Sequence, residues 1–208
     1  MDEKLKNLLE RGVTEIIVKE HLVEALQSGK KLRVKFGIDP TSPDLHLGHA
    51  VVLRKLREFQ ELGHKIVLII GDLTATIGDP SGRSETRQTL ALKEVESNMK
   101  EYLKEAGKIL DVKKCEVAYN SNWFKKDGFV KLLEIAKAVN ISQILEREDF
   151  DERIKSGRGI TVLEELYPIL QGWDSVEVKA DVEIGGTDQK FNLLMGRRIQ
   201  RYFGLPEQ

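Results

Sequence analysis

The sequence predicts an α/β protein built on an open parallel sheet with helices on both faces. Two observations support this fold class. Residues 32–72 follow the order strand, helix, strand, which makes one βαβ unit, and strands and helices continue to alternate toward the C-terminus. The stretch KIVLIIGD, residues 65–72, is rich in Val and Ile on both faces, as a strand of a parallel sheet requires.

Two helices are predicted before the sheet begins. The stretches LKNLLERG and VKEHLVEALQSGK carry apolar residues at helical spacing. They end at Gly12 and Gly29, and glycine is a common residue at helix C-termini. We therefore divide the chain into an N-terminal helical segment, residues 1–32, and a domain over residues 33–208.

The first strand is predicted at residues 32–39, LRVKFGID, where Gly37 allows another group to approach the backbone closely. An amphipathic helix follows at residues 47–62 and ends before Gly63. Its apolar residues recur at intervals of three and four: Val52, Leu53, Leu56, Phe59 and Leu62.

The later elements continue the alternation. We predict a helix from about Glu85 to Leu110 and a third strand at residues 115–122. Helices are then expected at residues 129–140, 142–157 and 161–173, and a fourth strand at residues 176–186. The final helix is expected at residues 187–204, with Thr187 as its N-cap.

Composition is typical of a soluble globular domain: 40% of the 208 residues are hydrophobic and 32% are charged. The net charge of −1 excludes an overall basic protein, although a local basic patch stays possible. One cysteine, Cys115, excludes an intramolecular disulfide and a cysteine-only metal site, and it fits a reducing cytoplasm. The apolar run IVLII is far shorter than the roughly 20 residues of a membrane helix, so no membrane partner is expected.

Three unusual segments are expected at the carboxyl edge of the sheet, where open α/β sheets bind their ligands. They are DPTSPDLHLGH after the first strand, GDLTATIGDPSGR after the second and GGTDQ after the fourth. Their shared location is stronger evidence for a binding site than any one of the three segments.

The sequence His-Leu-Gly-His places His46 and His49 about one helical turn apart at a helix N-terminus. Backbone N–H groups and the helix dipole attract anions there, so a nucleotide triphosphate is one possible occupant. Two ordinary surface histidines are the alternative. A zinc site would need a third ligand, and neither His21 nor His64 is placed to supply it.

Polar residues that follow the fourth strand also suggest a ligand. Gly185 and Gly186 allow a flat group to lie against the backbone, and Asp188 could accept two hydroxyl groups of a ribose or could cap a helix. Arg83 and Arg87 are four residues apart and could hold phosphates or lie on a solvated loop.

The stretch LYPILQGWD places Tyr167, Gln171 and Asp174 on one helix face. That face is polar where a core face would be apolar. Either a small polar ligand or an internal hydrogen-bond network would explain it.

Taken together, these segments resemble a known family. DPTSPDLHLGH is similar to the HIGH motif of class I aminoacyl-tRNA synthetases. The stretches IIGDLTATIGDPSGRSETR, NSNW and LYPILQGWDSVEVKADVEIGGTDQKFNLLMGR resemble the bacterial tyrosyl-tRNA synthetases, in order, from about Val13 to Gln208. The resemblance implies a Rossmann-type catalytic domain. It also implies that ATP with Mg²⁺ is a substrate complex that activates L-tyrosine to tyrosyl-adenylate, before transfer to tRNA(Tyr), with no protein-bound metal or prosthetic group.

The resemblance assigns roles to the nucleotide side of the site. Thr41 and His46 would reach the γ-phosphate, His49 would lie near the ribose, and Gly48 would leave room for adenine. Arg83 and Arg87 would grip pyrophosphate, and these two join Thr41, His46 and His49 as expected catalytic residues. The expected ATP- or adenylate-binding residues are Gly37, Asp39, His46, Gly48, His49, Gly185, Gly186, Asp188 and Gln189.

The resemblance also assigns the tyrosine side. Asp174 would accept the phenol proton, and Gln189 would lie beside the reacting carboxylate. The ammonium would be surrounded by Asp79, Tyr167 and Gln171. The expected tyrosine-binding residues are Lys35, Asp79, Tyr167, Gln171, Asp174 and Gln189. Lys35, Phe36 and Glu183 depart from the residues that some members carry at these positions.

The family continues beyond the stretch RYFGLPEQ with a KMSKS loop and an anticodon-binding domain, and neither is present here. We therefore expect poor tyrosine activation by these 208 residues and the loss of most tRNA contacts. A helical dimer-interface insertion is expected at about residues 124–160, so a homodimer is predicted. The alternatives are a tryptophanyl-type synthetase, a synthetase-derived RNA-binding protein without catalysis, and an unrelated nucleotide-binding domain.

Overall fold

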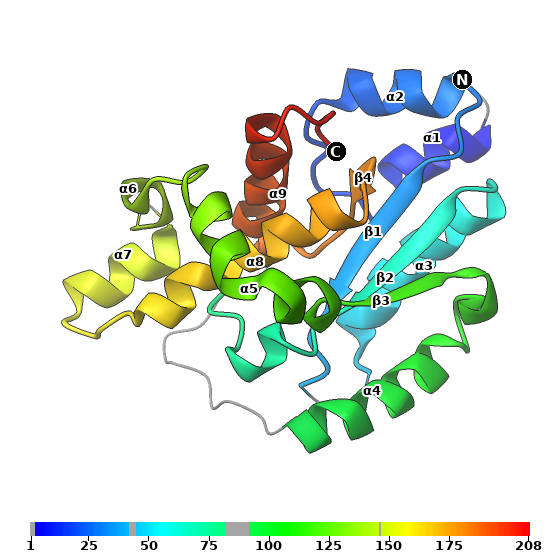
Figure 1. Cartoon of the computed structure of the whole chain (residues 1–208). Coiled ribbons are helices and arrows are strands. Elements are labelled where there is room, and N and C mark those ends of the chain that lie inside the picture. Colours follow the sequence, from blue (N-terminus) through cyan, green and yellow to red (C-terminus); the bar gives the residue numbers. More distant parts are fainter. Residues whose placement is uncertain (1–2, 42–44, 82–91, 146) are drawn as a thin grey trace.

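The computed structural model describes residues 3–41, 45–81, 92–145 and 147–208. Its centre is a parallel sheet in the order β3–β2–β1–β4 (Figure 1). Val34 of β1 pairs with Ile66 of β2 on one side and with Val182 of β4 on the other. The predicted open parallel sheet is therefore confirmed. The strands are β1 (Arg33–Ile38), β2 (Lys65–Ile70), β3 (Glu116–Tyr119) and β4 (Val182–Glu183).

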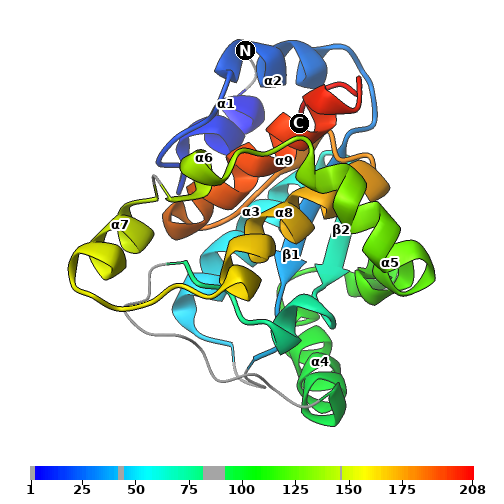
Figure 2. The same cartoon turned by 60° about the vertical axis from the view of Figure 1, so that its left-hand side comes forward.

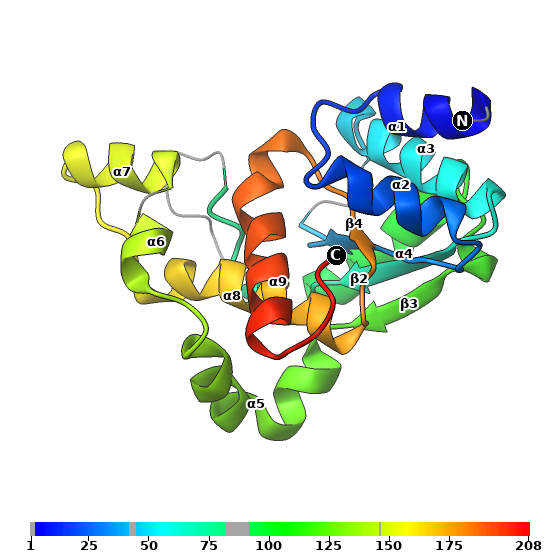
Figure 3. The ribbon, with the colours of Figure 1, turned by 90° about the horizontal axis from the view of Figure 1, so that it is seen from above.

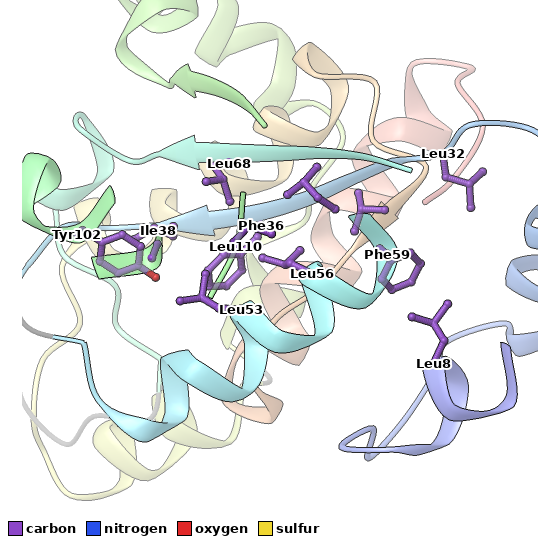
Figure 4. Packing of buried hydrophobic residues seen from close by; sticks show 13 residues of the cluster. Leu8, Leu32, Phe36, Ile38, Leu53, Leu56, Phe59, Leu68, Tyr102 and Leu110 are labelled. Carbon is purple, nitrogen blue, oxygen red and sulfur yellow. The ribbon is translucent and has the colours of Figure 1, made fainter. Parts of the chain in front are cut away.

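One face of the sheet packs against three helices, α1 (Glu3–Glu10), α3 (Leu47–Glu61) and α4 (Leu92–Ala106). Phe36 of β1 and Leu68 of β2 point into this core and meet Leu53 and Leu56 of α3 (Figure 4). Alternate residues of a strand face opposite sides, so the odd-numbered neighbours of Phe36 and Leu68 face the other layer. Leu8 of α1 is buried in the same core, so the N-terminal segment packs on the domain.

The other face packs against the C-terminal end of α8 (Val162–Glu177) and the residues that follow it. Val67 and Ile69 of β2 contact Val178 and Ala180 there. A second layer of apolar contacts joins α5 (Ser121–Ala136), α8 and α9 (Lys190–Tyr202). Helices thus cover both faces of the sheet, as predicted, and Figure 3 shows α3 and α5 on opposite sides.

Two short helices, α6 (Ile141–Leu145) and α7 (Glu148–Lys155), lie beyond α8 and α9 when viewed from the sheet (Figures 1 and 2). The remaining elements are α2 (Lys19–Gln27) and three 3₁₀ helices, η1 (Thr74–Thr76), η2 (Val112–Lys114) and η3 (Thr187–Gln189). Within the part of the chain that the structure describes, no helix combines the length and apolar character needed to cross a membrane.

Three helix ends agree with the sequence. Gly12, Gly29 and Gly63 have φ angles of 66°, 76° and 90°. This left-handed conformation is favourable for glycine and ends a helix by turning the backbone out of its path. These terminating residues are confirmed.

Three element predictions were wrong in extent, and the predicted start of a fourth element lies outside the described residues. The predicted helix at residues 142–157 is divided into α6 and α7. The third strand was predicted to extend to residue 122 but ends at Tyr119, because α5 begins at Ser121. The predicted fourth strand is reduced to Val182–Glu183, because α8 continues to Glu177 and Lys179 turns with a positive φ of 51°. The helix expected from Glu85 is described from Leu92, and residues 85–91 lie outside the described part of the chain.

The predicted N-cap at Thr187 was also wrong. Residues Thr187–Gln189 form η3, and α9 begins at Lys190 with Gln189 as its N-cap residue. The tight 3₁₀ turn places the side chains of Asp188 and Gln189 before the α-helix. These side chains therefore contact neighbouring loops, as described below.

Candidate active site

The predicted site residues come from the carboxyl ends of β1, β2 and β4 and from the face of α8 that packs beneath them. Parallel strands bring these ends to one edge because all their carboxyl termini point the same way. Residues more than 100 positions apart in sequence meet there, as the bond from Tyr167 to Asp39 shows.

His46 and His49 form a reciprocal cap at the start of α3. The Nδ1 atom of His46 accepts a hydrogen bond from the backbone N–H of Gly48 at 3.1 Å, and the Nδ1 atom of His49 accepts one from the N–H of His46 at 3.3 Å. The two rings stack with their centroids 3.9 Å apart. Because each Nδ1 accepts, each neutral ring carries its proton on Nε2 and can donate it to an anion.

Gly48 is required by this cap. A Cβ atom at position 48 would lie 2.9 Å from the Cε1 atom of the His46 ring, which is closer than side-chain atoms normally approach. Burial and the neighbouring His46 lower the pKa of His49, which favours its neutral form in the absence of an anion. The sequence prediction that both histidines lie on one side of the helix start is consistent with this geometry.

Asp39 follows β1 and accepts hydrogen bonds from two other segments, η1 and α8. Its Oδ1 accepts a hydrogen bond from Thr74 Oγ1 at 2.7 Å, and its Oδ2 accepts one from the Tyr167 hydroxyl at 2.8 Å. Gly71 must be a glycine, because a Cβ atom there would lie 2.0 Å from Asp39 Oδ1. Burial, followed by the charges of Asp39 and Asp79, raises the pKa of Tyr167 well above its usual value, so Tyr167 is a neutral donor.

Two residues of this network, Thr74 and Asn120, were missed by the sequence analysis. Asn120 is fully buried, donates to Thr74 Oγ1 at 3.0 Å and accepts from the N–H of Leu73 at 3.0 Å. Asn120 belongs to the NSNW stretch, which was quoted for its resemblance and not for a role. The available signal was an asparagine near the end of the predicted third strand, since asparagine side chains often bond to backbone groups where a strand ends.

Asp174 lies on α8 with only 3% of its surface exposed. Its Oδ1 accepts a hydrogen bond from the indole N–H of Trp123 at 2.9 Å. Burial raises its pKa to about 7, although Lys35 and Trp123 act in the opposite direction. A buried carboxyl group that changes charge near neutral pH is suited to accept a hydrogen bond from a polar ligand.

Lys35 and Glu183 form a buried ion pair beneath the same helix. The Nζ atom of Lys35 lies 2.8 Å from Glu183 Oε1, donates to Ser175 Oγ at 2.7 Å and donates to the carbonyl of Gln171 at 3.0 Å. Lys35 and Glu183 are also direct partners in the register of β1 and β4. These two departures from the family pattern therefore compensate each other. The predicted contact of Lys35 with tyrosine stays a prediction.

Gln189 and Asp79 form a second set of contacts with Asp188. The Nε2 atom of Gln189 donates to Asp79 Oδ2 at 2.6 Å and to Asp188 Oδ2 at 3.1 Å. Gly186 is constrained here, because a Cβ atom would lie 2.3 Å from Asp188 Oδ1. The structure thus brings together three predicted polar side chains from the loop after β2 and from η3.

Thr41 adjoins this cluster through the backbone of Asp39, and the space beside Gly37 is open. Thr41 donates its backbone N–H to the carbonyl of Asp39 at 2.7 Å, and a Cβ atom added at Gly37 would meet no atom within 4 Å. Arg83 and Arg87 lie outside the described residues. Across the described parts of the chain, His, Cys, Asp and Glu side chains form no group of three that could hold a metal ion.

A cavity of about 690 Å³ lies beside the polar cluster and not within it. It separates the N-terminal segment from β4 and from α9, and among the predicted site residues it is lined by Gly48, Gly185 and Gly186. Because its other walls are mostly apolar, we place the candidate site at the polar side chains around Asp39, Asp174 and Gln189.

Comparison with known proteins gives one family. The family model described as "tRNA synthetases class I (W and Y)" matches residues 27–207, which is most of the chain. The tyrosine–tRNA ligase of Thermotoga maritima is 52% identical over 207 residues, and that of Carboxydothermus hydrogenoformans is 51% identical over 213 residues. These alignments cover 100% and 99% of this chain but 51% and 52% of the relatives. The chain thus spans about half the length of the curated relatives it matches.

Solved structures give the same fold. The mitochondrial tyrosyl-tRNA synthetase of Coccidioides posadasii, in a C-terminally truncated form, is 27% identical with a TM-score of 0.80 over 98% of this chain and 61% of that chain. The tyrosyl-tRNA synthetase of Archaeoglobus fulgidus, complexed with L-tyrosine, is 24% identical with a TM-score of 0.80 over 100% of this chain and 62% of that chain. The Rossmann-like fold class is therefore confirmed.

Proposed function

Because this chain belongs to the class I tRNA synthetases of the tryptophan and tyrosine type, we propose that it carries the tyrosine- and ATP-binding site of a tyrosine–tRNA ligase. The proposed reaction begins when the carboxylate of tyrosine attacks the α-phosphate of ATP, which is bound with Mg²⁺ as substrate. Tyrosyl-adenylate and pyrophosphate are formed. The tyrosyl group is then transferred to the terminal ribose of tRNA(Tyr).

The buried carboxyl group of Asp174 is the observation that carries the proposal for tyrosine. A phenol hydroxyl can donate to Asp174 Oδ2, while Oδ1 accepts from Trp123. Phenylalanine has no such donor and would leave a buried carboxyl group without a partner, which costs binding free energy. Tryptophan would have to place an indole N–H at this point, and the relatives at about half identity carry the name tyrosine–tRNA ligase.

The far end of the cluster suits the amino acid backbone. Asp79 and Tyr167 present oxygen atoms that can accept from an ammonium group, and Gln189 presents an amide near the expected carboxylate. We infer that Gln171, one turn before Asp174 on α8, completes this polar wall. The carbonyl of Gln171 holds Lys35 away from it by accepting a hydrogen bond from the Lys35 amine.

On the nucleotide side, we infer that the Nε2–H groups of His46 and His49 donate to phosphate or ribose oxygens of ATP. Their positions at the N-terminus of α3 support this, because the helix dipole and backbone N–H groups also favour an anion there. Asp188, whose carboxylate is set by η3, is proposed to accept the ribose hydroxyls. Such a site accelerates the reaction through positioning and charge stabilisation, with no covalent protein intermediate.

The second step, transfer to tRNA, and the binding partners need separate statements. Since the chain spans about half of its relatives, transfer to tRNA is proposed for the longer protein, and these 208 residues are expected to activate tyrosine poorly. A homodimer in the cytoplasm is proposed. The exposed apolar side chains of Phe129, Val130 and Leu133 on α5 support a contact with a second copy.

Calorimetric binding of a non-hydrolysable tyrosyl-adenylate analogue to the 208-residue chain tests the proposal. Tryptophanyl- and phenylalanyl-adenylate analogues serve as competitors. We expect the tyrosyl analogue to bind at least tenfold more tightly than the phenylalanyl one, because one lost hydrogen bond to a buried charge costs about 1.5–3 kcal/mol. The Asp174→Ala variant should lose this preference.

A matched control is available on the same helix. Glu177 also accepts a hydrogen bond from an indole N–H, that of Trp173 at 2.8 Å, but it lies outside the cluster. Glu177→Ala should keep the preference for the tyrosyl analogue. A tryptophanyl preference in the unmodified chain would favour the tryptophan branch of the family, and no selective binding by a folded chain would refute the proposed site.

A further inference from the structure

We propose that Arg147, Ser81 and Asn192 are positioning residues that fix Asp79 and Gln189 for binding the charged ends of the amino acid. This inference rests on the proposed function, because it concerns the same site. None of the three residues belongs to the set predicted from the sequence. They come from the junction of α6 and α7, from the loop after β2 and from α9.

The inner part of this network holds both oxygens of Asp79. Its Oδ1 accepts from the backbone N–H of Ser81 at 2.9 Å, and its Oδ2 accepts from Gln189 Nε2 at 2.6 Å. The amide of Gln189 is held at both ends, because its Oε1 accepts from Asn192 Nδ2 at 3.1 Å. Without Asn192, the amide could rotate and turn its oxygen toward the Asp79 carboxylate.

The outer part of the network meets at the hydroxyl of Ser81. Its Oγ accepts from Asn192 Nδ2 at 3.2 Å and from Arg147 Nη2 at 3.3 Å. Asn192 is fully buried and Arg147 is 5% exposed. These contacts are sheltered from water, so they are stronger and more directional than similar contacts on a surface.

Arg147 itself is held rigidly. Its guanidinium makes two hydrogen bonds to Asp149, at 3.0 and 2.6 Å, and lies 4.4 Å from the ring centroid of Phe150 and 5.2 Å from that of Phe191. A planar guanidinium held by a carboxylate and stacked on rings has little freedom to move. Arg147 therefore anchors the loop that carries Asp79 to the α6–α7 junction, through its hydrogen bond to Ser81.

Burying these polar groups costs folding free energy, which packing alone does not explain. Among the described residues, the buried Nη1 atom of Arg147 has no hydrogen-bond acceptor and the buried Oδ1 atom of Asn192 has no donor. Between two phenylalanine rings, an apolar side chain would avoid this cost. A buried arginine that reaches a polar hub is better explained by a need to orient that hub.

Arg153 provides a matched control. It lies on α7, is 2% exposed, binds a carboxylate through Glu164 at 2.7 Å and lies 6.0 Å from the same Phe150 ring. Its guanidinium bonds to Glu164 and to the carbonyl of Gly159, and neither residue belongs to the network around Ser81. Replacing Arg153 therefore tests the general effect of removing a buried arginine from this helical region.

The experiment compares two probes, L-tyrosine by calorimetry and 4-methylphenol by NMR titration, on the 208-residue chain. 4-Methylphenol keeps the phenol end but has neither ammonium nor carboxylate. In Arg147→Met and Asn192→Leu we expect the Kd for L-tyrosine to rise about tenfold, while the Kd for 4-methylphenol changes less than about twofold. Arg153→Met should lower the Tm yet keep both Kd values. Arg147→Lys, which keeps a donor near Ser81, should restore part of the affinity.

Two results would overturn the inference. One is unchanged tyrosine binding in Arg147→Met and Asn192→Leu. The other is an equal loss of both probes, which indicates a damaged fold. If the unmodified chain fails to bind L-tyrosine, the proposed function fails first. The network is then judged by the side-chain amide resonance of Gln189, which must shift in Arg147→Met and not in Arg153→Met; equal or absent shifts would reject it.

Discussion

The carboxyl group of Asp174 is buried against an indole N–H and near the buried amine of Lys35. Burial raises its pKa to about 7, whereas an exposed aspartate ionises near 3.9 in unfolded chains. A group whose pKa is raised on folding stabilises the protein below its unfolded pKa. That stability is lost as the pH rises through the folded pKa.

Asp174→Asn should therefore change stability in a pH-dependent way. Asparagine cannot ionise, so the variant avoids the cost of charging a buried carboxyl group. We expect the free energy of unfolding of Asp174→Asn, relative to the unmodified chain, to rise between pH 4 and pH 8 by on the order of 4 kcal/mol. Urea unfolding of both proteins at pH 4.5, 6 and 8 measures the difference. A difference that stays constant with pH would show that the pKa of Asp174 is not raised.

The role of Lys35 depends on its neighbour Glu183. The family resemblance directs attention to Lys35 as a ligand of tyrosine. In the fold, its amine is occupied by Glu183, Ser175 and the carbonyl of Gln171. We infer that Lys35 acts on the ligand mainly through the charge it places near Asp174.

At the scale of one element, α8 carries the residues proposed to bind tyrosine, and its first turn is held by a capping contact. Thr161 caps the helix: its Oγ1 accepts from the N–H of Glu164 at 3.2 Å, and Glu164 Oε2 accepts from the N–H of Thr161 at 2.9 Å. Glu164 also binds the buried Arg153. The start of α8 is thus tied to α7, and Tyr167 follows one turn later.

This double role predicts two different losses of stability. Thr161→Ala removes one capping acceptor and should cost about 1 kcal/mol. Glu164→Ala also leaves Arg153 buried without its carboxylate and should cost about 3–5 kcal/mol. Urea unfolding midpoints measure both, and Glu165→Ala, at the next residue, serves as the control with an expected change within about 0.5 kcal/mol. Equal effects of Thr161→Ala and Glu164→Ala would contradict the role given to Glu164.

At the scale of the whole molecule, an apolar face of α5 stays exposed. Phe129 is 75% exposed and Leu133 is 53% exposed, one helical turn apart, and Val130 lies beside them. Exposed apolar residues that cluster on one helix often mark an interface. This face lies within residues 124–160, where the resemblance implies a dimer contact.

We therefore expect the chain to form a homodimer that substitutions on this face disrupt. Phe129→Glu combined with Leu133→Glu should give the mass of one chain, 23.6 kDa, in sedimentation or light-scattering measurements, while the unmodified chain gives twice that mass. Val51→Glu is the control, because Val51 is equally exposed at 55% but lies on α3, on the opposite face of the sheet. An unmodified chain that stays monomeric at high concentration would contradict this expectation.

The sequence alone determined the order of the main elements and the sheet edge at which the candidate site residues gather. Hydrophobic periodicity and helix-ending glycines are local signals, and parallel strands place their carboxyl ends together in any such sheet. For these reasons the βαβ unit, Gly12, Gly29, Gly63 and the polar face of α8 could be read without coordinates.

Only the tertiary structure decided which side chains meet. The short β4, the separate α6 and α7, and η3 at residues 187–189 depend on packing between distant segments, which local propensity does not encode. The Lys35–Glu183 pair joins residues 148 positions apart through strand register, and Arg147 reaches Ser81 across 66 positions. Such contacts arise because folding brings distant residues into one low-dielectric interior, where an unpaired buried polar group is costly and most such groups are paired.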